Sequence, residues 1–191
     1  MSPARTREQL HNHYLVEKEL ADRLRAASPD ERPSLYETLY DELFQRVPDH
    51  PRLTRRETAA ESRKAVEARM RFVDTWLTPE TDFLEVAPGD CRFAFEVAKK
   101  ARKVFGADIS DQSGVDDKPK NFELIIYDGR SFEFPDESVD LAFSYQFLEH
   151  IHPDEVPAHF EMIHRVLKPG GKYILDTPHR FSGPHDISRY F

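Results

Sequence analysis

A chain of 191 residues with 39% hydrophobic residues is long enough for one domain with a real core, or for one domain with an appendage. Its net charge of -8 argues against nucleic-acid binding through a basic face, and its one cysteine, Cys91, excludes an internal disulfide. Because the first residues are polar and no apolar run approaches about 18 residues, we expect no signal peptide and no membrane-spanning helix, and therefore a cytoplasmic protein.

Apolar residues at helical spacing predict three helices before residue 77. The first covers 10–24, and the second contains the sequence LYETLYDELF over 35–44. Thr54 and Glu57 have the spacing of a capping box, which predicts the start of a third helix. We expect residues 1–77 to form a helical extension that acts as a lid.

The pattern changes after residue 77, where short apolar strands alternate with amphipathic helices. The predicted strands cover 83–86, 103–108, 122–127, 139–144 and 172–176, and the predicted helices cover 92–101 and 153–167. Strands that alternate with helices imply a parallel sheet with right-handed crossovers. We therefore predict a Rossmann-like α/β domain over 78–191, built on five parallel strands.

Polar residues stand at the ends of four of these strands. Glu85 lies at the end of the first strand and Asp108 at the end of the second. Asp128 follows the third strand, and Ser144 ends the fourth. Ligands of open parallel sheets bind beyond the carboxyl ends of the strands, where an acid after the second strand can accept both ribose hydroxyls of a nucleoside. Any one of these acids alone could be a solvent-exposed turn residue. Because they follow successive strands in order, the interpretation that they line one shared cleft is favoured.

Three blocks within residues 81–178 resemble the class I S-adenosylmethionine-dependent methyltransferases. The first block, FLEVAPGDCRFAFEVAKKARKVFGADIS, resembles the first motif of that family and its second-strand acid. The second, IIYDGRSFEFPDESVDLAFSYQFLEHI, resembles the block that runs from the adenine-binding acid to the end of the fourth strand. The third, HRVLKPGGKYILDTP, resembles the turn before the fifth strand and that strand itself. The resemblance implies S-adenosylmethionine as cofactor and methyl transfer as activity.

The loop after the first strand departs from the family pattern of an acid followed by three alternating glycines. Ala87 and Cys91 occupy the first and third glycine positions, and Gly89 keeps the second. The middle position is the one at which a Cβ would obstruct the approach of the cofactor. Alanine and cysteine are small enough to be tolerated at their positions if their φ is negative.

The resemblance implies a set of cofactor-binding residues at the strand ends. These residues are Glu85, Ala87, Gly89, Asp108, Ile109, Asp128, Gly129, Ser144 and Tyr145. By this resemblance, Asp108 binds the ribose, Ile109 packs on the adenine and Asp128 accepts a hydrogen bond from its amino group. Glu85 orients the methionine end, and Tyr145 borders the methyl group together with Ser144.

The methyl acceptor is expected to be a small molecule or a sugar, with an oxygen acceptor slightly preferred because of the histidines near the strand ends. A hydroxyl acceptor needs a base, and histidine titrates near neutrality. His150 after the fourth strand and His185 with Asp186 after the fifth are the candidates. No metal site is expected, because the histidines of the HNH sequence at 11–13 are two positions apart on a predicted helix. Neither a nucleic acid nor a membrane is expected as partner.

Two alternatives remain open. A nicotinamide-binding domain would require glycines where Ala87 and Arg92 stand, so the sequence disfavours it. A methyltransferase-like module that binds without catalysing transfer is the second alternative, because the family fold has a further antiparallel strand pair that this chain does not supply. Either the chain is truncated, or a partner or a second copy of the chain covers the open sheet edge.

Overall fold

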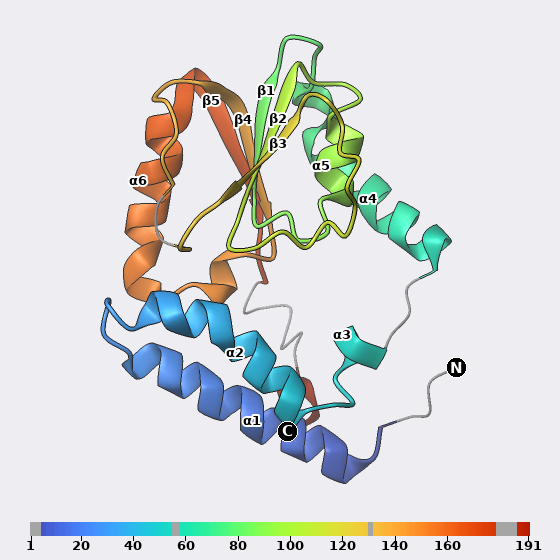
Figure 1. Cartoon of the computed structure of the whole chain (residues 1–191), viewed down its shortest axis with the longest axis vertical. Helices are drawn as coiled ribbons and strands as arrows, with labels where there is room; N and C mark the ends of the chain where they lie inside the picture. Colours follow the sequence, from blue (N-terminus) through green and yellow to red (C-terminus); the bar gives the residue numbers. More distant parts are fainter. Residues whose placement is uncertain (1–4, 55–57, 130–131, 179–186) are drawn as a thin grey trace. The chain divides into compact units, whose positions relative to one another are not determined.

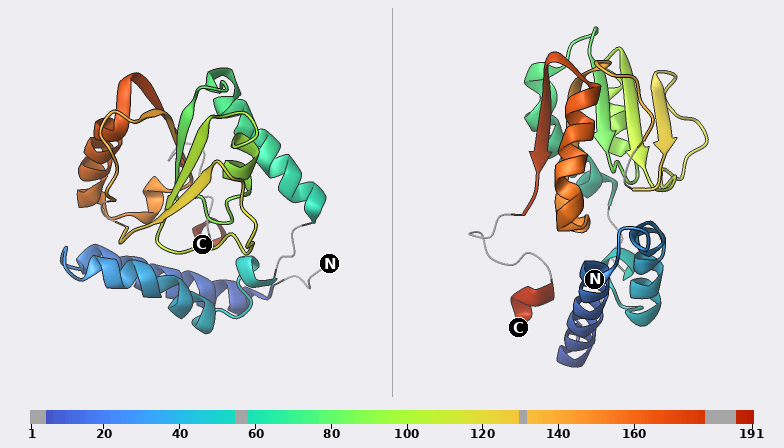
Figure 2. Two further views of the ribbon diagram at one scale, coloured as in Figure 1. Left: turned by 45° about the horizontal axis from the view of Figure 1, so that its top comes forward. Right: turned by 90° about the vertical axis from the view of Figure 1, so that its left-hand side faces the viewer.

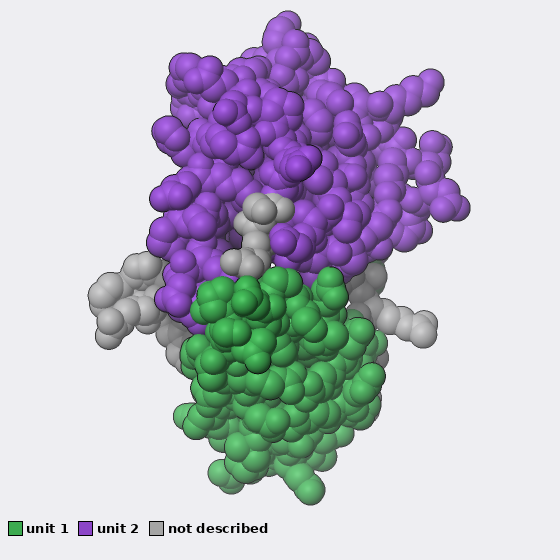
Figure 3. Space-filling model, turned by 60° about the vertical axis from the view of Figure 1, so that its left-hand side comes forward, with its two compact units in different colours: residues 1–58, 178–191 green, residues 59–177 purple. Residues whose placement is uncertain are grey.

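The computed structural model describes residues 5–54, 58–129, 132–178 and 187–191. The chain divides into two compact units, one of residues 59–177 and one of residues 1–58 with 178–191 (Figure 3). Residues 59–177 contain every strand of the described chain, and they carry most of the residues that the sequence predicts to be functional.

The larger unit is built on a five-stranded parallel sheet in the order β3-β2-β1-β4-β5 (Figure 1). Its strands are β1 (Asp82–Val86), β2 (Lys103–Asp108), β3 (Phe122–Ile126), β4 (Val139–Tyr145) and β5 (Leu167–Asp176). All five residues of β1 are buried, as expected for the central strand of a sheet that is covered on both faces. The predicted Rossmann-like fold with five parallel strands is confirmed.

Helices cover both faces of this sheet (Figures 1 and 2). On one face, α4 (Ala59–Val73) and α5 (Arg92–Val97) enclose a core that includes Phe93 and Phe143. On the other face, α6 (Val156–Val166) packs Met162 and Ile163 against β1 and β4. The short 3-10 turns of this unit are η1 (Asp74–Trp76), η2 (Leu148–His150) and η3 (Pro153–Glu155).

Several predicted boundaries were wrong. The fifth strand begins at Leu167 rather than at residue 172, because the LKPGG sequence continues as strand through a register shift against β4. The α5 helix ends at Val97, earlier than the predicted residue 101. Thr54 ends the short helix α3 (Pro51–Thr54) instead of starting a long one, and its hydroxyl donates to the His50 carbonyl. Glu57, its predicted capping partner, lies outside the described residues.

The smaller unit consists of α1 (Arg7–Ala26), α2 (Arg32–Arg46), α3 and the 3-10 turn η5 (Ile187–Tyr190). A capping box between Thr6 and Gln9 starts α1. The helices α1 and α2 share a small core that is formed by Val16, Leu20, Leu43 and Val47. That the residues before 77 form a lid stays a prediction, although Met70 and Val73 of α4 lie in the core of the larger unit.

Charged side chains tie the starts of three strands together at the amino edge of the sheet. The Asp82 carboxylate accepts hydrogen bonds from the Arg102 guanidinium and, at 3.0 Å, from Lys168 Nζ. Lys168 Nζ also donates to Asp140 Oδ2 at 2.7 Å, and that oxygen accepts from the Asp82 backbone amide at 2.8 Å. This base network of Asp82, Arg102, Asp140 and Lys168 links β1, β4 and β5.

Removing the charge of Asp82 is expected to destabilise the fold and to change its response to acid. The Arg102 hydrogen bonds lower the pKa of Asp82 below 3.8, so the folded chain keeps this carboxylate ionised where the unfolded chain protonates it. This stabilisation is fully present above the unfolded-state pKa of about 3.8, and it is lost as the pH falls through the lower pKa of the folded chain. Asp82→Asn should reduce the free energy of unfolding by about 1–3 kcal/mol at pH 7. Urea titrations should show a smaller difference in this free energy between the native protein and the variant at pH 3 than at pH 7.

The exposed pair of Glu123 and Lys103 offers a matched control for this measurement. Glu123→Gln removes a surface ion pair at 2.8 Å and should change the free energy of unfolding by less than about 1 kcal/mol. Equal losses in the two variants would contradict the structural role of the base network.

Candidate functional site

The sheet order places a topological switch point between the carboxyl ends of β1 and β4, the position of the ligand crevice in open α/β sheets. The chain proceeds from β1 outward to β2 and β3 and then returns to the other side of β1 as β4 and β5. The connections after β1 and β4 therefore leave in opposite directions, which is where open α/β sheets bind ligands. In the strand register, Val86 lies beside Ser144 on one side and beside Ala107 on the other. The predicted strand-end residues of β1, β2 and β4 are thus neighbours.

The loop after β1 adopts left-handed backbone conformations at each of its three glycine-motif positions. Ala87, Gly89 and Cys91 have φ values of 56°, 56° and 58°. The condition of a negative φ is therefore not met at Ala87 and Cys91, and both residues adopt the backbone conformation that favours glycine. Apart from the chain neighbours of Gly89, no atom of the described residues lies within 4 Å of a Cβ built on it, so this position borders open space.

Replacing Ala87 with glycine is expected to stabilise the protein. A left-handed conformation costs a residue with a Cβ roughly 1–2 kcal/mol, and glycine avoids this cost but loses more chain entropy on folding. Ala87→Gly should therefore raise the free energy of unfolding by about 0.5–1 kcal/mol in urea titration. The matched control is Ala94→Gly inside α5, where the same exchange should cost about 1 kcal/mol. A loss at both positions would contradict the left-handed assignment of Ala87.

Asp108 joins the tip of β2 to this loop. Its carboxylate is buried and accepts hydrogen bonds from the Gly89 amide at 3.0 Å and from the Ile109 amide at 2.8 Å. Burial raises the pKa of Asp108, and backbone donors of Gly89, Ile109 and Ser110 oppose that rise. A carboxylate has about four acceptor positions, so Asp108 keeps capacity for further donors such as hydroxyl groups.

Glu85, at the tip of β1, is a buried carboxyl group that lacks a full set of partners. Its exposed fraction is 1%, and its Oε2 atom has no hydrogen-bond partner among the described residues. Burial raises the pKa of Glu85 to about 8, and the Coulombic attraction of Arg69 opposes this rise. An unpaired buried acceptor is unfavourable in a folded protein unless a ligand or water completes it. The position of Glu85 in the crevice is consistent with such a ligand.

Arg69 lies beside these strand-end residues and was not predicted as a candidate. It lies on α4, and its guanidinium carbon is 4.4 Å from the centre of the Tyr145 ring at the tip of β4. The sequence contains a cluster of basic residues between Arg52 and Arg71, which is the only signal of this region in the sequence. Which of these cations turns toward the sheet depends on the packing of α4, and periodicity alone does not give that orientation.

A buried hydrogen-bond chain supports the tip of β4. The Ser144 hydroxyl lies 2.7 Å from the Tyr173 hydroxyl, which lies 2.8 Å from His159 Nε2 on α6. Burial lowers the pKa of His159 to about 4 and raises the pKa of Tyr173 to about 12, so both side chains are neutral near pH 7. Ser144 is fully buried, and its hydroxyl is held by the Tyr173 hydroxyl.

The other predicted residues lie at or near the strand ends. Ile109 directly follows β2, and Asp128 and Gly129 follow β3. The Tyr127 amide donates to the Asp108 carbonyl at 3.0 Å, which holds this segment beside the tip of β2. His150 is exposed at the end of η2, after β4. The predicted His185 and Asp186 lie outside the described residues.

The smaller unit holds a cluster of potential metal ligands and a shallow groove. His13, Glu17 and His50 are the group in the described part of the chain whose ligand atoms lie within 4.8 Å of one another. His13 Nδ1 faces Arg5 at 2.9 Å and His50 Nδ1 accepts from the Arg52 amide at 3.1 Å, so the ring protons occupy the Nε2 atoms that face Glu17. These rings therefore present N–H groups rather than lone pairs to the centre of the cluster.

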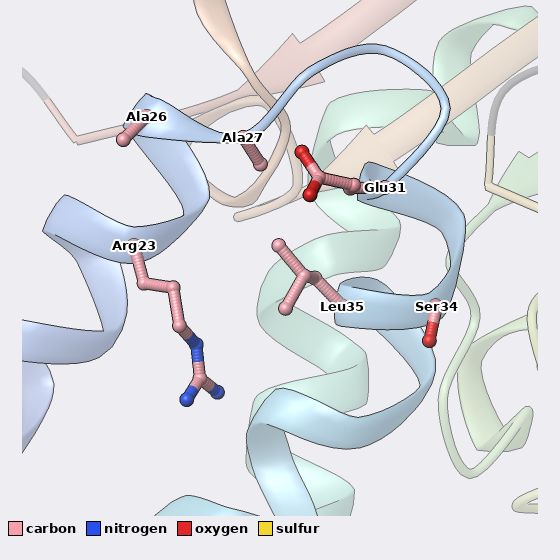
Figure 4. Close-up of a pocket in the computed structure, with 6 residues that line it drawn as sticks. All are labelled: Arg23, Ala26, Ala27, Glu31, Ser34 and Leu35. Carbon is pink, nitrogen blue, oxygen red and sulfur yellow. The ribbon is translucent and has the colours of Figure 1, made fainter.

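The groove has a volume of about 450 Å³ and lies between the end of α1 and the start of α2 (Figure 4). Its lining consists of Arg23, Ala26, Ala27, Glu31, Ser34 and Leu35. None of the predicted site residues lines it. No helix within 5–54, 58–129, 132–178 and 187–191 has both the length and the apolar character that a membrane crossing requires.

Comparisons with known proteins agree with the geometry of the larger unit. Residues 84–175 match the model of a methyltransferase domain family. A probable S-adenosylmethionine-dependent methyltransferase of Mycolicibacterium smegmatis is 32% identical over 103 residues, which are 53% of this chain and 39% of that protein.

Solved structures share the fold. Phosphoethanolamine N-methyltransferase 1 of Haemonchus contortus, in complex with phosphoethanolamine and S-adenosylhomocysteine, aligns with a TM-score of 0.61 and 21% identity, covering 79% of this chain and 33% of that one. A Pyrococcus horikoshii protein aligns with a TM-score of 0.57 and 26% identity, covering 70% of this chain and 64% of that one. The [4+2]-cyclase SpnF aligns with a TM-score of 0.50 and 22% identity, covering 63% and 47%. This chain spans well under half the length of the mycobacterial and nematode proteins.

Proposed function

We propose, from the premise that residues 84–175 belong to the class I S-adenosylmethionine-dependent methyltransferases, that the chain binds S-adenosylmethionine at the strand tips and catalyses methyl transfer. The observation that carries this proposal is the hydrogen bond between the Gly89 amide and the Asp108 carboxylate. This bond connects Asp108, which has the position expected of a ribose partner, to the loop after β1. That loop borders open space and lies at the switch point of the parallel sheet.

Two observations support the fit of this cofactor to the residues present. The unpaired Oε2 atom of Glu85 offers a buried acceptor at the crevice. The space beside Gly89 leaves its backbone open to close approach. In the bound state, Asp108 would accept the ribose hydroxyls, Ile109 would pack on the adenine and Asp128 would accept from its amino group.

The bound cofactor supplies a methyl group that its positively charged sulfur already activates. The task of the protein is then to align the acceptor with that group and to exclude water. Tyr145, at the tip of β4, would border the methyl group, while Ser144 and its hydrogen-bond chain hold the strand tip from below.

We propose a hydroxyl of a small molecule or of a sugar as the acceptor. The first candidate for the base that removes the hydroxyl proton is His150, which is exposed and follows β4. The second candidate is His185 with Asp186, which lie outside the described residues. The nematode enzyme is named for methylation at nitrogen, but its 21% identity to this chain concerns the fold. An amine acceptor is therefore the competing outcome of a substrate screen.

A binding module without transferase activity is the second candidate function. The [4+2]-cyclase SpnF shares this fold, but its name refers to a cyclisation and not to methyl transfer. In addition, β5 pairs only with β4 among the described strands, so one sheet edge is open to a partner or to a second copy of the chain.

The test combines calorimetry with transfer of a labelled methyl group. The protein is titrated with S-adenosylmethionine and with S-adenosylhomocysteine, and is then incubated with methyl-labelled cofactor and panels of hydroxyl and amine acceptors. Micromolar binding with label transfer is the expected result. Binding without transfer to any acceptor would favour the module, and a lack of binding to either nucleoside would refute the proposed cofactor site.

A further inference from the structure

The second half of β5 is an unprotected edge of the sheet. Among the described strands β5 pairs with β4 alone, and Figure 2 shows it at one margin of the sheet. Proline and irregular pairing are two features that protect strand edges. The first half of β5 has both, because Pro169 and Gly170 lie within the register shift against β4. From Lys172 to Asp176 the pairing with β4 is regular, so this half is able to accept a further strand.

Two residues of this half direct their backbone N–H and C=O groups to the open edge. The Asp176 carbonyl accepts a hydrogen bond from the Gln146 amide at 2.8 Å, so the backbone groups of Asp176 face the side of β4. Successive residues of a strand direct these groups to opposite sides. The groups of Ile174 therefore also face β4, whereas those of Tyr173 and Leu175 face outward, where a further strand would bind them.

Exposed aromatic side chains flank this edge on both faces of the sheet. On the face that α4 covers, Trp76 is exposed, and Lys172 Nζ lies 4.5 Å from the centre of its ring. On the face that α6 covers, Phe160 is exposed, and its ring centre lies 5.9 Å from that of Tyr173. Large apolar side chains that gather on a surface are typical of an interaction site. Here they stand beside a strand that can itself be paired.

The charges of this half of β5 are complementary to a second copy of the same strand. An antiparallel copy that is centred on Ile174 places Lys172 opposite Asp176 of the second copy, and Asp176 opposite its Lys172. The same register joins Tyr173 to Leu175 of the second copy as a hydrogen-bonded pair, as the outward direction of their backbone groups requires. Registers that are centred on Lys172 or on Asp176 bring like charges together. Registers that are centred on Tyr173 or on Leu175 place neither charge opposite another charge.

We propose that the open edge of β5 is an interaction surface for a second copy of this chain, which adds its own β5 in antiparallel orientation about a two-fold axis at Ile174. Such an interface is self-complementary, because each copy offers the same strand to the other. Lys172 Nζ donates to the Gly170 carbonyl at 3.3 Å and has three donors in all. Asp176 accepts from the Gln146 side chain through Oδ1, one of its two carboxylate oxygens. Both charged groups thus keep bonding capacity for the second copy.

Charge reversal at the two positions tests this pairing through the association state of the full chain. Sedimentation velocity from about 1 to about 100 μM should show a dimer whose fraction rises with concentration. Lys172→Glu and Asp176→Lys each bring like charges together at both symmetric contacts, so each variant should weaken dimerisation about 30-fold. The matched control Lys99→Glu makes the same change of charge at an exposed residue that follows α5, and it should leave the dimer unchanged.

An equimolar mixture of the two variants tests the register itself. In a mixed dimer of Lys172→Glu with Asp176→Lys, opposite charges meet again at both contacts. The mixture should therefore dimerise with nearly the native affinity, although each variant alone is largely monomeric. Recovery in the mixture also shows that both variants are folded, because an unfolded chain would not regain the interface.

The results divide clearly. Loss of the dimer in each variant with recovery in the mixture supports the antiparallel pairing of β5. A native chain that stays monomeric at every concentration overturns it, and so does a native dimer that both charge reversals leave intact. Loss in each variant without recovery in the mixture overturns it as well. None of these results bears on methyl transfer, because calorimetry with the cofactor measures its binding separately.

Discussion

Replacing Asp108 with alanine is expected to weaken S-adenosylhomocysteine binding by more than about 100-fold. A carboxylate that accepts two ribose hydroxyls makes two charge-assisted hydrogen bonds, each of which contributes roughly 1.5–3 kcal/mol. The alanine variant also leaves the Gly89 and Ile109 amides without their acceptor, which loosens the loop. Calorimetric titration of the folded variant measures the loss.

Two further variants separate the direct contact from the effect on the loop. Asp108→Asn keeps an oxygen that can accept from the Gly89 amide but lacks the negative charge, so its affinity should lie between those of the native protein and the alanine variant. Asp116→Ala removes an exposed acid from the segment that follows β2 and should leave the affinity within about 2-fold. Native affinity in Asp108→Ala would exclude Asp108 as the ribose partner.

Replacing Phe143 with alanine is expected to cause the largest loss of stability among single changes at the sheet. Its side chain is 0% exposed, and its ring centre lies 4.9 Å from that of Phe93 on α5. Removing a buried phenylalanine side chain costs about 3–5 kcal/mol, because the loss of contacts adds to the cost of the cavity. Thermal unfolding followed by near-ultraviolet circular dichroism should show a marked decrease in Tm.

The matched control for this change is Phe160→Ala on α6, whose side chain is 41% exposed. It should cost less than about 1 kcal/mol. Phe143 lies beside Glu85 in the register of β4 and β1, so the unstable variant should also lose ligand affinity. Similar Tm values for the two variants would contradict the packing of the core between β4 and α5.

The strands of the larger unit could be predicted from sequence because each is a short apolar run between polar turns. The placement of Glu85, Asp108 and Ser144 near one another was predictable from the same pattern, since the ends of successive parallel strands meet at one edge of the sheet. Once the strand order is known, the position of a residue at the end of a strand gives its neighbours in the structure.

Features that depend on packing or on backbone conformation could not be predicted. The left-handed φ of Ala87 and Cys91 is a property of the turn, and neither residue type indicates it. The contact of Arg69 with Tyr145 was missed because it depends on which side of α4 faces the sheet. The hydrogen bond between His159 and Tyr173 depends on how α6 packs against β5, which the sequence pattern does not give.

The base network has a consequence for engineering this protein. Asp82, Asp140 and Lys168 connect their strands at the edge opposite to the one that carries Glu85 and Ser144. Loops grafted after β4 or β5 to change the proposed acceptor would leave these ion pairs intact. Variants with such grafted loops should therefore remain folded even where they no longer bind the acceptor.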